Sequence, residues 1–246
     1  MKKAQHAFIR AVYDELSEGN IQHVLSLISE FLRGKKTNKL KLTPSPLLNS
    51  VGKEIGKLLV KESWRFKRLM KLWKEGRRDE RLIVISALGE ISKKDYENSK
   101  SFVLNVLNDI PDWEICDQLA VKVVVNLVIQ NRDEMFSLMQ KWIKSENKWI
   151  RRLAVATIPP YIRREKTESK ICLQLLNEEM KEEDKDVKKA IGWALREVAK
   201  KDPESVFEFL QRWAKVKDKN TKWIIKDGMR KLGDKEQEKL KTLISG

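Results

Sequence analysis

The chain has 246 residues, 35% of them charged, and a formal net charge of +15 at pH 7. Its ten glycines and six prolines are few for this length, and apolar residues mostly recur every three or four positions, which predicts an all-α fold. A charge of this size and sign favours a polyanionic partner, either nucleic acid or an acidic membrane surface.

Several classes of protein are disfavoured by simple features of the sequence. Cys116 and Cys172 both lie in apolar helical patterns, so we expect packed thiols in a reducing compartment rather than a disulfide. His6 and His23 have different surroundings, and no metal site is expected. No run of 18 apolar residues occurs, and the start MKKAQHAFIR lacks the apolar core of a signal peptide. We expect a soluble, cytoplasmic protein that does not bind membranes and is associated with the nucleoid if it is prokaryotic.

The first hundred residues read as a series of amphipathic helices. The predicted helices cover 5–17, 21–33, about 44–60, 64–75, a segment from Asp79, and about 99–109. Between the second and the third lies RGKKTNKLK, residues 33–41, with five basic residues and no acidic one. This stretch is either an ordinary solvated loop or a loop that faces phosphates.

The stretch 111–131 predicts a helix that opens after Pro111, with Asp112 as its N-cap. Asp117 lies off its polar stripe and in line with apolar residues, one turn after Trp113. The polar stripe comprises Glu114, Gln118, Lys122 and Asn126, and the apolar residues around Asp117 include Val121, Val124 and Val128. A buried carboxylate costs several kcal/mol unless it is compensated. Asp117 is therefore either paired with an arginine from a neighbouring helix or kept for chemistry at the mouth of an aromatic pocket.

Similar helix starts recur in the second half of the chain. The segments that begin at Ile150, Val187 and Ile224 are spaced 37 residues apart. Helix pairs that recur at roughly this period are typical of an α-solenoid of the HEAT or armadillo kind, whose concave wall forms the natural binding surface. No long linker interrupts the pattern. We therefore predict a single HEAT-like repeat domain over 1–246, a superhelix with a concave basic face, that is monomeric.

Two of these helices carry residues that a plain solenoid does not require. In 186–201, Trp193 lies opposite the apolar stripe, in a row with Lys189, Arg196 and Lys200, where it either recognises a ligand or is covered by a neighbouring repeat. Gly192, in the middle of the helix, indicates a close approach by a ligand or by another helix. In 147–159, Arg152 points away from the core, and Pro159-Pro160 is expected to end the helix.

Three segments carry a resemblance to a known family. They are Asp112-Trp113-Glu114-Ile115-Cys116-Asp117, Lys148-Trp149-Ile150-Arg151-Arg152 and Lys189-Ala190-Ile191-Gly192-Trp193-Ala194-Leu195-Arg196-Glu197. In order and spacing they resemble the AlkD-like DNA alkylation repair enzymes, which are alkylpurine DNA glycosylases built from HEAT-like repeats. The likeness extends over about 111–213 and is weak before residue 100.

The resemblance implies a role for each matching residue. Asp117 would be the catalytic carboxylate, Trp113 and Trp193 would contact the lesion, and Arg152 would contact DNA beside them. Arg196 and Lys189 match positions suited to phosphate contact. The implied substrate is double-stranded DNA carrying alkylated purines of the 3-methyladenine and 7-methylguanine type, with no metal and no cofactor.

The predicted chemistry suits these residue types. A purine alkylated on a ring nitrogen is cationic and already a good leaving group, so what remains is to stabilise an oxocarbenium-like sugar and to position water, which an ionised carboxylate can do. Indole faces attract a cationic base over a neutral one. The alternative is a non-catalytic HEAT-like module that binds nucleic acid or an acidic protein, with Asp117 as a buried ion-pair partner.

Overall fold

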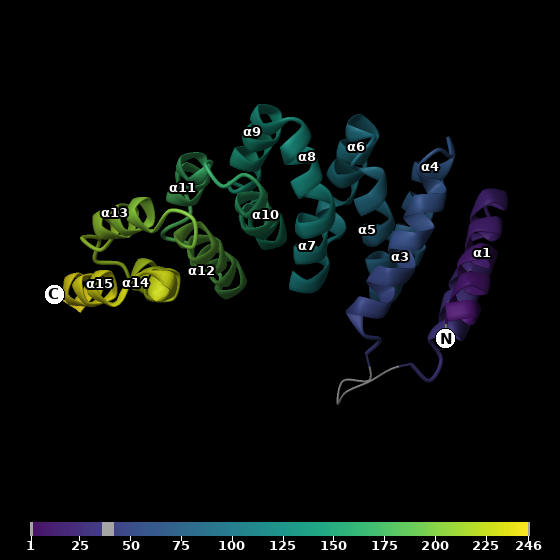
Figure 1. Cartoon of the computed structure of the whole chain (residues 1–246), viewed down its shortest axis with the longest axis horizontal. Helices are drawn as coiled ribbons and strands as arrows, with labels where there is room; N and C mark the ends of the chain where they lie inside the picture. Colours follow the sequence, from purple (N-terminus) through teal and green to yellow (C-terminus); the bar gives the residue numbers. More distant parts are fainter. Residues whose placement is uncertain (1, 36–41, 246) are drawn as a thin grey trace. The chain divides into compact units, whose positions relative to one another are not determined.

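The computed structural model describes residues 2–35 and 42–245, and the regular elements of these residues are helices (Figure 1). Residues 36–41 of the predicted phosphate-facing loop lie outside the described residues. The chain divides into two compact units. One unit comprises the chain up to Val106 together with 122–130, and the other comprises 107–121 and the chain from Asn131 onward. The prediction of a single repeat domain over 1–246 is not tested by this division.

The first unit is a stack of helices whose tightest contact joins α3 and α5. Its elements are α1 (Lys2–Glu18), α2 (Ile21–Leu32), α3 (Ser45–Leu59), α4 (Arg65–Glu75), α5 (Arg78–Ile91), α6 (Tyr96–Val106) and α8 (Val125–Gln130). Gly52 and Gly56 face α5 so closely that an added Cβ would meet backbone atoms of Ile83 and Ala87. Because the two glycines lack a side chain, the backbones of α3 and α5 come almost into direct contact.

The second unit has the predicted repeat of helix pairs. Its elements are η1 (Leu107–Asp109), α7 (Trp113–Leu119), α9 (Arg132–Trp142), α10 (Lys148–Arg164), α11 (Ser169–Asn177), α12 (Lys185–Ala199), α13 (Pro203–Trp213), α14 (Lys219–Gly228), η3 (Met229–Lys231) and α15 (Asp234–Ser245). α10 packs between α7 and α12, and α12 packs between α10 and α14 (Figure 1). α9, α11 and α13 form the second row of helices. The all-α, HEAT-like prediction is confirmed.

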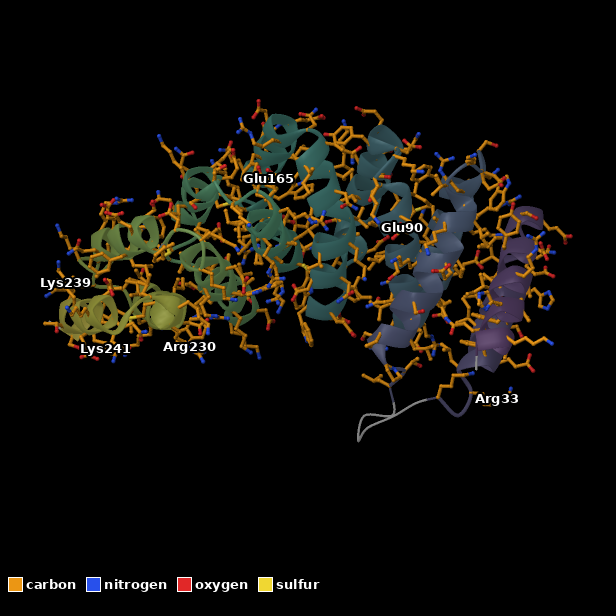
Figure 2. The ribbon with its side chains drawn as sticks, viewed as in Figure 1. Arg33, Glu90, Glu165, Arg230, Lys239 and Lys241 are labelled. Carbon is orange, nitrogen blue, oxygen red and sulfur yellow. The ribbon has the colours of Figure 1, made fainter. Side chains whose placement is uncertain are left out.

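The period of 37 residues has a direct structural meaning in this unit. Ile150, Val187 and Ile224 begin equivalent apolar stripes on α10, α12 and α14, and all three are buried. The stripes predicted for α10 and α12 are buried throughout. Figure 2 shows Arg230 of η3 and Lys239 and Lys241 of α15 projecting outward. The sequence pattern therefore predicted both the helices and their buried faces.

Two predicted helix features are wrong. Pro159 and Pro160 do not end α10, which continues to Arg164 with both prolines inside it. A proline in a helix removes one hydrogen bond and crowds the preceding turn. Both prolines are buried here, and burial of their rings offsets part of that cost.

The helix predicted over 111–131 is interrupted by a π-helical turn, η2 (Ala120–Val124), between α7 and α8. A π turn holds an extra residue and rotates every later side chain around the axis. Asn126, expected in the polar stripe, is consequently buried and donates to the carbonyl of Gly89 at 3.1 Å and to Ser92 Oγ at 2.9 Å. The prediction that Asn126 faces solvent, which rested on its polar side chain, is wrong.

Neither cysteine is in a disulfide. Cys116 and Cys172 are free and buried, as the packing prediction required. No helix of the described residues is both long and apolar enough to cross a membrane.

Candidate active site

The start of α7 is fixed by its N-cap. Asp112 Oδ1 accepts hydrogen bonds from the backbone N–H groups of Glu114 at 2.9 Å and Ile115 at 3.0 Å, which confirms the predicted cap. Trp113 is therefore the first residue of the helix and Asp117 lies one turn later. Trp113 is 57% exposed, an unusual placement for so large an apolar residue.

Asp117 is paired with Arg152 of α10. Arg152 Nε donates to Oδ1 at 2.9 Å and Nη2 donates to Oδ2 at 2.7 Å, which makes a bidentate pair. The Asp117 side chain keeps 17% of its surface exposed. The carboxylate is thus held in one orientation without being sealed in the interior.

Arg152 is less exposed than its sequence position suggested. It was predicted on the solvent side of its helix, but the residue is only 7% exposed. Besides pairing with Asp117, its Nη1 donates to the main-chain oxygen of Asp186 at the start of α12. Because the guanidinium joins α7 to α12 across the end of α10, neighbouring helices cover it. Periodicity within one helix cannot reveal such a contact.

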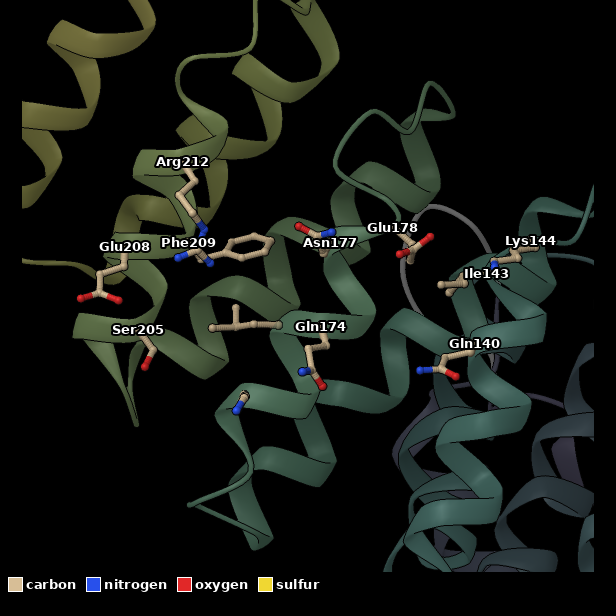
Figure 3. Close-up of a pocket in the computed structure, with 12 residues that line it drawn as sticks. Gln140, Ile143, Lys144, Gln174, Asn177, Glu178, Ser205, Glu208, Phe209 and Arg212 are labelled. Atoms are coloured by element: carbon tan, nitrogen blue, oxygen red, sulfur yellow. The ribbon is translucent and has the colours of Figure 1, made fainter.

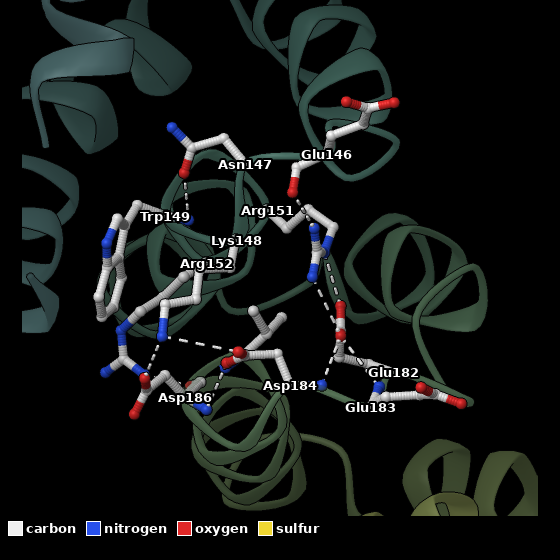
Figure 4. A network of polar contacts seen from close by, with 11 residues as sticks. Glu146, Asn147, Lys148, Trp149, Arg151, Arg152, Glu182, Glu183, Asp184 and Asp186 are labelled. Carbon is white, nitrogen blue, oxygen red and sulfur yellow. Dashed lines mark hydrogen bonds and ion pairs between the residues drawn. The ribbon is translucent and has the colours of Figure 1, made fainter.

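A second layer of charged side chains holds this end of the repeat together (Figure 4). Lys148 Nζ lies 2.8 Å from Asp186 Oδ2 and 4.4 Å from the ring centroid of Trp149. Arg151 donates from Nε to Glu182 Oε2 at 2.7 Å and from Nη2 to Oε1 at 3.2 Å. These ion pairs fix the loop before α12, and therefore the Asp186 carbonyl that orients Arg152.

Burial and pairing act on Asp117 in opposite directions. Partial burial raises the pKa of the Asp117 carboxyl above its usual value, while the hydrogen bonds and the positive charge of Arg152 lower it. The net shift is upward. The adjacent guanidinium stabilises the anion, which is the form that can interact with a developing positive charge.

Trp193 is half-buried on α12, and the Arg163 guanidinium lies 5.9 Å from the centroid of its ring. The prediction of an exposed tryptophan is therefore only partly met, because a neighbouring helix covers one side of it. Gly192 has a packing explanation, since an added Cβ would collide with the carboxylate of Asp227. The close approach expected there is made by α14.

Arg196 and Lys189, the two cations assigned to phosphate contact, differ in exposure and in pairing. Arg196 is half-buried and its Nη1 donates to the Asp227 carboxylate of α14. Lys189 is exposed. Of the six residues proposed from the sequence, Asp117 and Arg152 are hydrogen-bonded to each other. Trp113, Trp193, Lys189 and Arg196 lie on α7 and α12, the two helices that flank α10.

Asp186 is the site residue that sequence reasoning missed. Its main chain orients Arg152 and its side chain pairs with Lys148. The available signal was the repeat, because Asp186 follows Trp149 by 37 residues and so occupies the equivalent place on the next helix. The place that Trp149 takes on α10 is taken by Asp186 on α12. This change from an indole to a carboxylate indicates a polar contact between the two repeats.

A cavity in this unit lies away from the site. It has a volume of about 760 Å³ and is lined mainly by residues of α9, α11 and α13, among them Gln174, Phe209 and Arg212 (Figure 3). Asp117 does not line it, and the Asp117 side chain keeps 17% of its surface exposed. No cluster of three or more potential metal ligands occurs among the described residues.

Comparison with known proteins places this geometry in a family. The profile of the DNA alkylation repair enzyme family matches residues 42–232, which is well over half of the chain. The chain belongs to this family. The match confirms the family resemblance noted in the sequence, and its range spans all three segments that carry it.

Solved structures of DNA alkylation repair proteins share the fold. AlkD2 from Streptococcus mutans is 16% identical, with a TM-score of 0.63 over 84% of this chain and 98% of that one. A protein from Enterococcus faecalis, described as a predicted DNA alkylation repair enzyme, is 18% identical, with a TM-score of 0.65 over 85% and 95%.

A third neighbour was solved with a ligand. Alkylpurine DNA glycosylase AlkC from Pseudomonas fluorescens, bound to DNA that contains an abasic-site analogue, is 14% identical, with a TM-score of 0.62 over 96% of this chain and 66% of that one. No curated protein sequence gives a significant match. At these identities the structural likeness establishes the fold alone.

Proposed function

We propose that this DNA alkylation repair enzyme hydrolyses the N-glycosidic bond of cationic alkylated purines in duplex DNA. The observation that carries the proposal is the Asp117 carboxylate, which is partly exposed, fixed by a bidentate arginine and one turn from an exposed indole. Fixed charges aimed at the place where opposite charge develops are among the largest contributions to catalysis.

The reaction needs only one acidic group. A purine that is positively charged by alkylation leaves without being protonated, and the bond electrons go to its ring. The sugar that remains has oxocarbenium character, which the Asp117 anion stabilises. The same carboxylate orients the water that attacks C1′ and accepts the proton that this water loses. No cofactor is required, because water is the second substrate.

The tryptophans supply selectivity for a charged base. Trp113 presents an exposed indole at the start of α7, and Trp193 presents a half-buried one on α12. An indole face attracts a cationic ring over a neutral one. Since Trp113 is exposed and the Asp117 side chain is partly exposed, we expect the lesion to be recognised along a surface groove, with limited or no insertion into an enclosed pocket.

The runner-up is a binding module without catalysis, and the Asp117–Arg152 pair itself favours it. A bidentate ion pair between two packed helices is a common structural device. In that case the pair only orients α7 on α10, and the basic surface alone binds nucleic acid or an acidic protein.

Asp117→Asn separates the two functions. The asparagine keeps the size of the side chain but not its charge. We expect release of free base from methylated duplex DNA to fall by about 100-fold or more, with cooperative unfolding retained and affinity for undamaged duplex within about two-fold. Free base is measured after incubation of wild type and variant with the same methylated duplex.

Asp218→Asn is the matched control. Asp218 caps α14, and asparagine caps a helix about as well as aspartate. The control removes one negative charge from the same unit, so it reports any effect of net charge on DNA binding. A wild type that releases no base, or an Asp117→Asn variant that unfolds, favours the binding module.

A further inference from the structure

The position of Arg152 recurs in the next two repeats. With a period of 37 residues, Arg152 on α10 corresponds to Lys189 on α12 and to Lys226 on α14. α12 packs against both of the other helices, so the three positions follow one another along the same row of helices. Arg152 is buried by its partners, whereas Lys189 and Lys226 are exposed.

Trp223 places a large apolar surface beside Lys226. It is 40% exposed, and apart from Trp113 no other tryptophan of the described residues is as open. Its repeat equivalent on α10 is Trp149. Each of these indoles has a lysine over its ring: Lys148 Nζ lies 4.4 Å from the ring centroid of Trp149, and Lys188 Nζ lies 5.7 Å from that of Trp223.

The two lysines nevertheless differ in their polar partners. Lys148 is paired with the Asp186 carboxylate, whereas Lys188 donates to the neutral side-chain oxygen of Asn220 at 2.7 Å. The positive charge beside Trp223 is therefore not neutralised by that contact. Since an exposed tryptophan is disfavoured in water, a cationic surface built around one fits a partner that is both anionic and partly apolar.

The acids of α14 do not cancel this charge. Asp227 is paired with Arg196 and with Arg230, the latter at 3.2 Å. Asp218 caps the helix by accepting from the Thr221 N–H at 2.7 Å. Lys226 consequently presents its charge to solvent next to an acid that is already paired twice.

We propose that Trp223 and Lys226, continued by Lys189, contact the sugar–phosphate backbone of the duplex to one side of the lesion. The proposal rests on the proposed function. It extends the DNA contact from α10 across α12 to α14. Lysine amines bind phosphates, and the indole covers the apolar edge of a deoxyribose. Neighbouring helix axes are 8–10 Å apart, so α14 lies about 20 Å from α10. That span corresponds to roughly six base pairs at 3.4 Å each.

The experiment compares Lys226→Gln and Trp223→Ala with controls elsewhere in the same unit. Lys170→Gln removes an exposed cation from α11, in the other row of helices, and Leu243→Ala truncates an exposed apolar residue of α15. Affinity for undamaged duplex is measured by fluorescence anisotropy across a range of salt concentrations.

Lys226→Gln is expected to weaken binding about five-fold at about 0.1 M salt. It should also make the slope of log affinity against log salt concentration (the salt slope) shallower by about one. Trp223→Ala is expected to weaken binding by about five-fold and to leave the salt slope unchanged. Both controls should stay within about two-fold of wild type. Equal losses in Lys226→Gln and Lys170→Gln, or unchanged affinity in Lys226→Gln and Trp223→Ala, overturn the proposal.

The reach of the contact is tested with duplexes anchored by an abasic-site analogue and shortened from one end. Trp223→Ala should match wild type on duplexes that end about three base pairs from the analogue and should lose affinity on those that extend beyond about six. A loss that does not depend on duplex length counts against the contact. These readouts require no base release, so failure of the glycosylase proposal and failure of this contact are distinguishable.

Discussion

At the scale of single residues, the site depends on one arginine serving two helices. Arg152 fixes the Asp117 carboxylate of α7 and binds the Asp186 carbonyl of α12. Arg151, the residue next to Arg152, pairs with Glu182, and Glu182 shares a hydrogen bond with Glu179. The charged layer around the site is thus continuous with the loop between α11 and α12.

Glu179 makes the stability of this loop depend on pH. Its burial, its hydrogen bond with Glu182 and the charge of Glu182 raise the pKa of its carboxyl from 4.5 to about 8, against the lowering effect of Arg151. Between those values the folded state holds a proton that the unfolded state has lost. The contribution of Glu179 to the free energy of unfolding is therefore fully present below about pH 4.5 and is lost as the pH rises toward about 8.

Glu179→Gln should remove this dependence. We expect the melting temperature of wild type to fall between about pH 6 and pH 9 by about 3 °C more than that of Glu179→Gln. The exposed Glu204 of α13 provides the control, as Glu204→Gln should keep the pH dependence of wild type. Parallel melting curves for wild type and Glu179→Gln across this range would contradict the argument.

At the scale of elements, glycines set how closely helices approach. Gly56 of α3 faces the backbone of α5, where an added Cβ would lie 2.5 Å from the carbonyl oxygen of Ala87. Gly192 of α12 faces the end of the Asp227 side chain instead. A side chain can rotate away, at the cost of disturbing its ion pair with Arg196, whereas a helix backbone can only be pushed apart.

The two glycines should therefore respond differently to alanine. Gly56→Ala is expected to destabilise the protein by about 2–3 kcal/mol, because two packed helices must separate. Gly192→Ala should cost about 1 kcal/mol or less, because the gain in helix propensity offsets part of the displacement of Asp227. Urea denaturation of both variants measures the difference, and a larger loss in Gly192→Ala would refute this ranking.

At the scale of the whole molecule, charge is the dominant feature. The net charge of +15 is distributed over a chain in which many acids are already used as helix caps or ion-pair partners, as Asp218 and Asp227 illustrate. Many lysines are left to solvent. Such a surface attracts a polyanion at long range and releases counterions when it binds.

Affinity for undamaged duplex should consequently depend steeply on salt. Each neutralised phosphate contributes about −0.9 to the slope of log affinity against log salt concentration. We expect a slope steeper than about −3 for wild type, measured by titration at several salt concentrations. An affinity that does not change with salt concentration would exclude DNA as the principal partner. The partner would then be uncharged or weakly charged.

The sequence by itself determined the helices, the repeat and the family. Apolar residues every three or four positions identified the buried stripes of α10 and α12, and the spacing of Ile150 and Val187 identified the period. These features are local or periodic, so one chain suffices to read them. The N-cap at Asp112 is equally local and was predicted for the same reason.

Only the tertiary structure decided which polar residues meet. From the sequence, Asp117 is either paired with an arginine of a neighbouring helix or kept for chemistry at the mouth of an aromatic pocket. The bidentate contact is made by Arg152, 35 residues further along the chain. The π turn that buries Asn126 and the prolines inside α10 were likewise beyond its reach. Hydrogen bonds and ion pairs between repeats depend on how neighbouring helices are rotated and spaced, and no pattern within a single helix encodes that geometry.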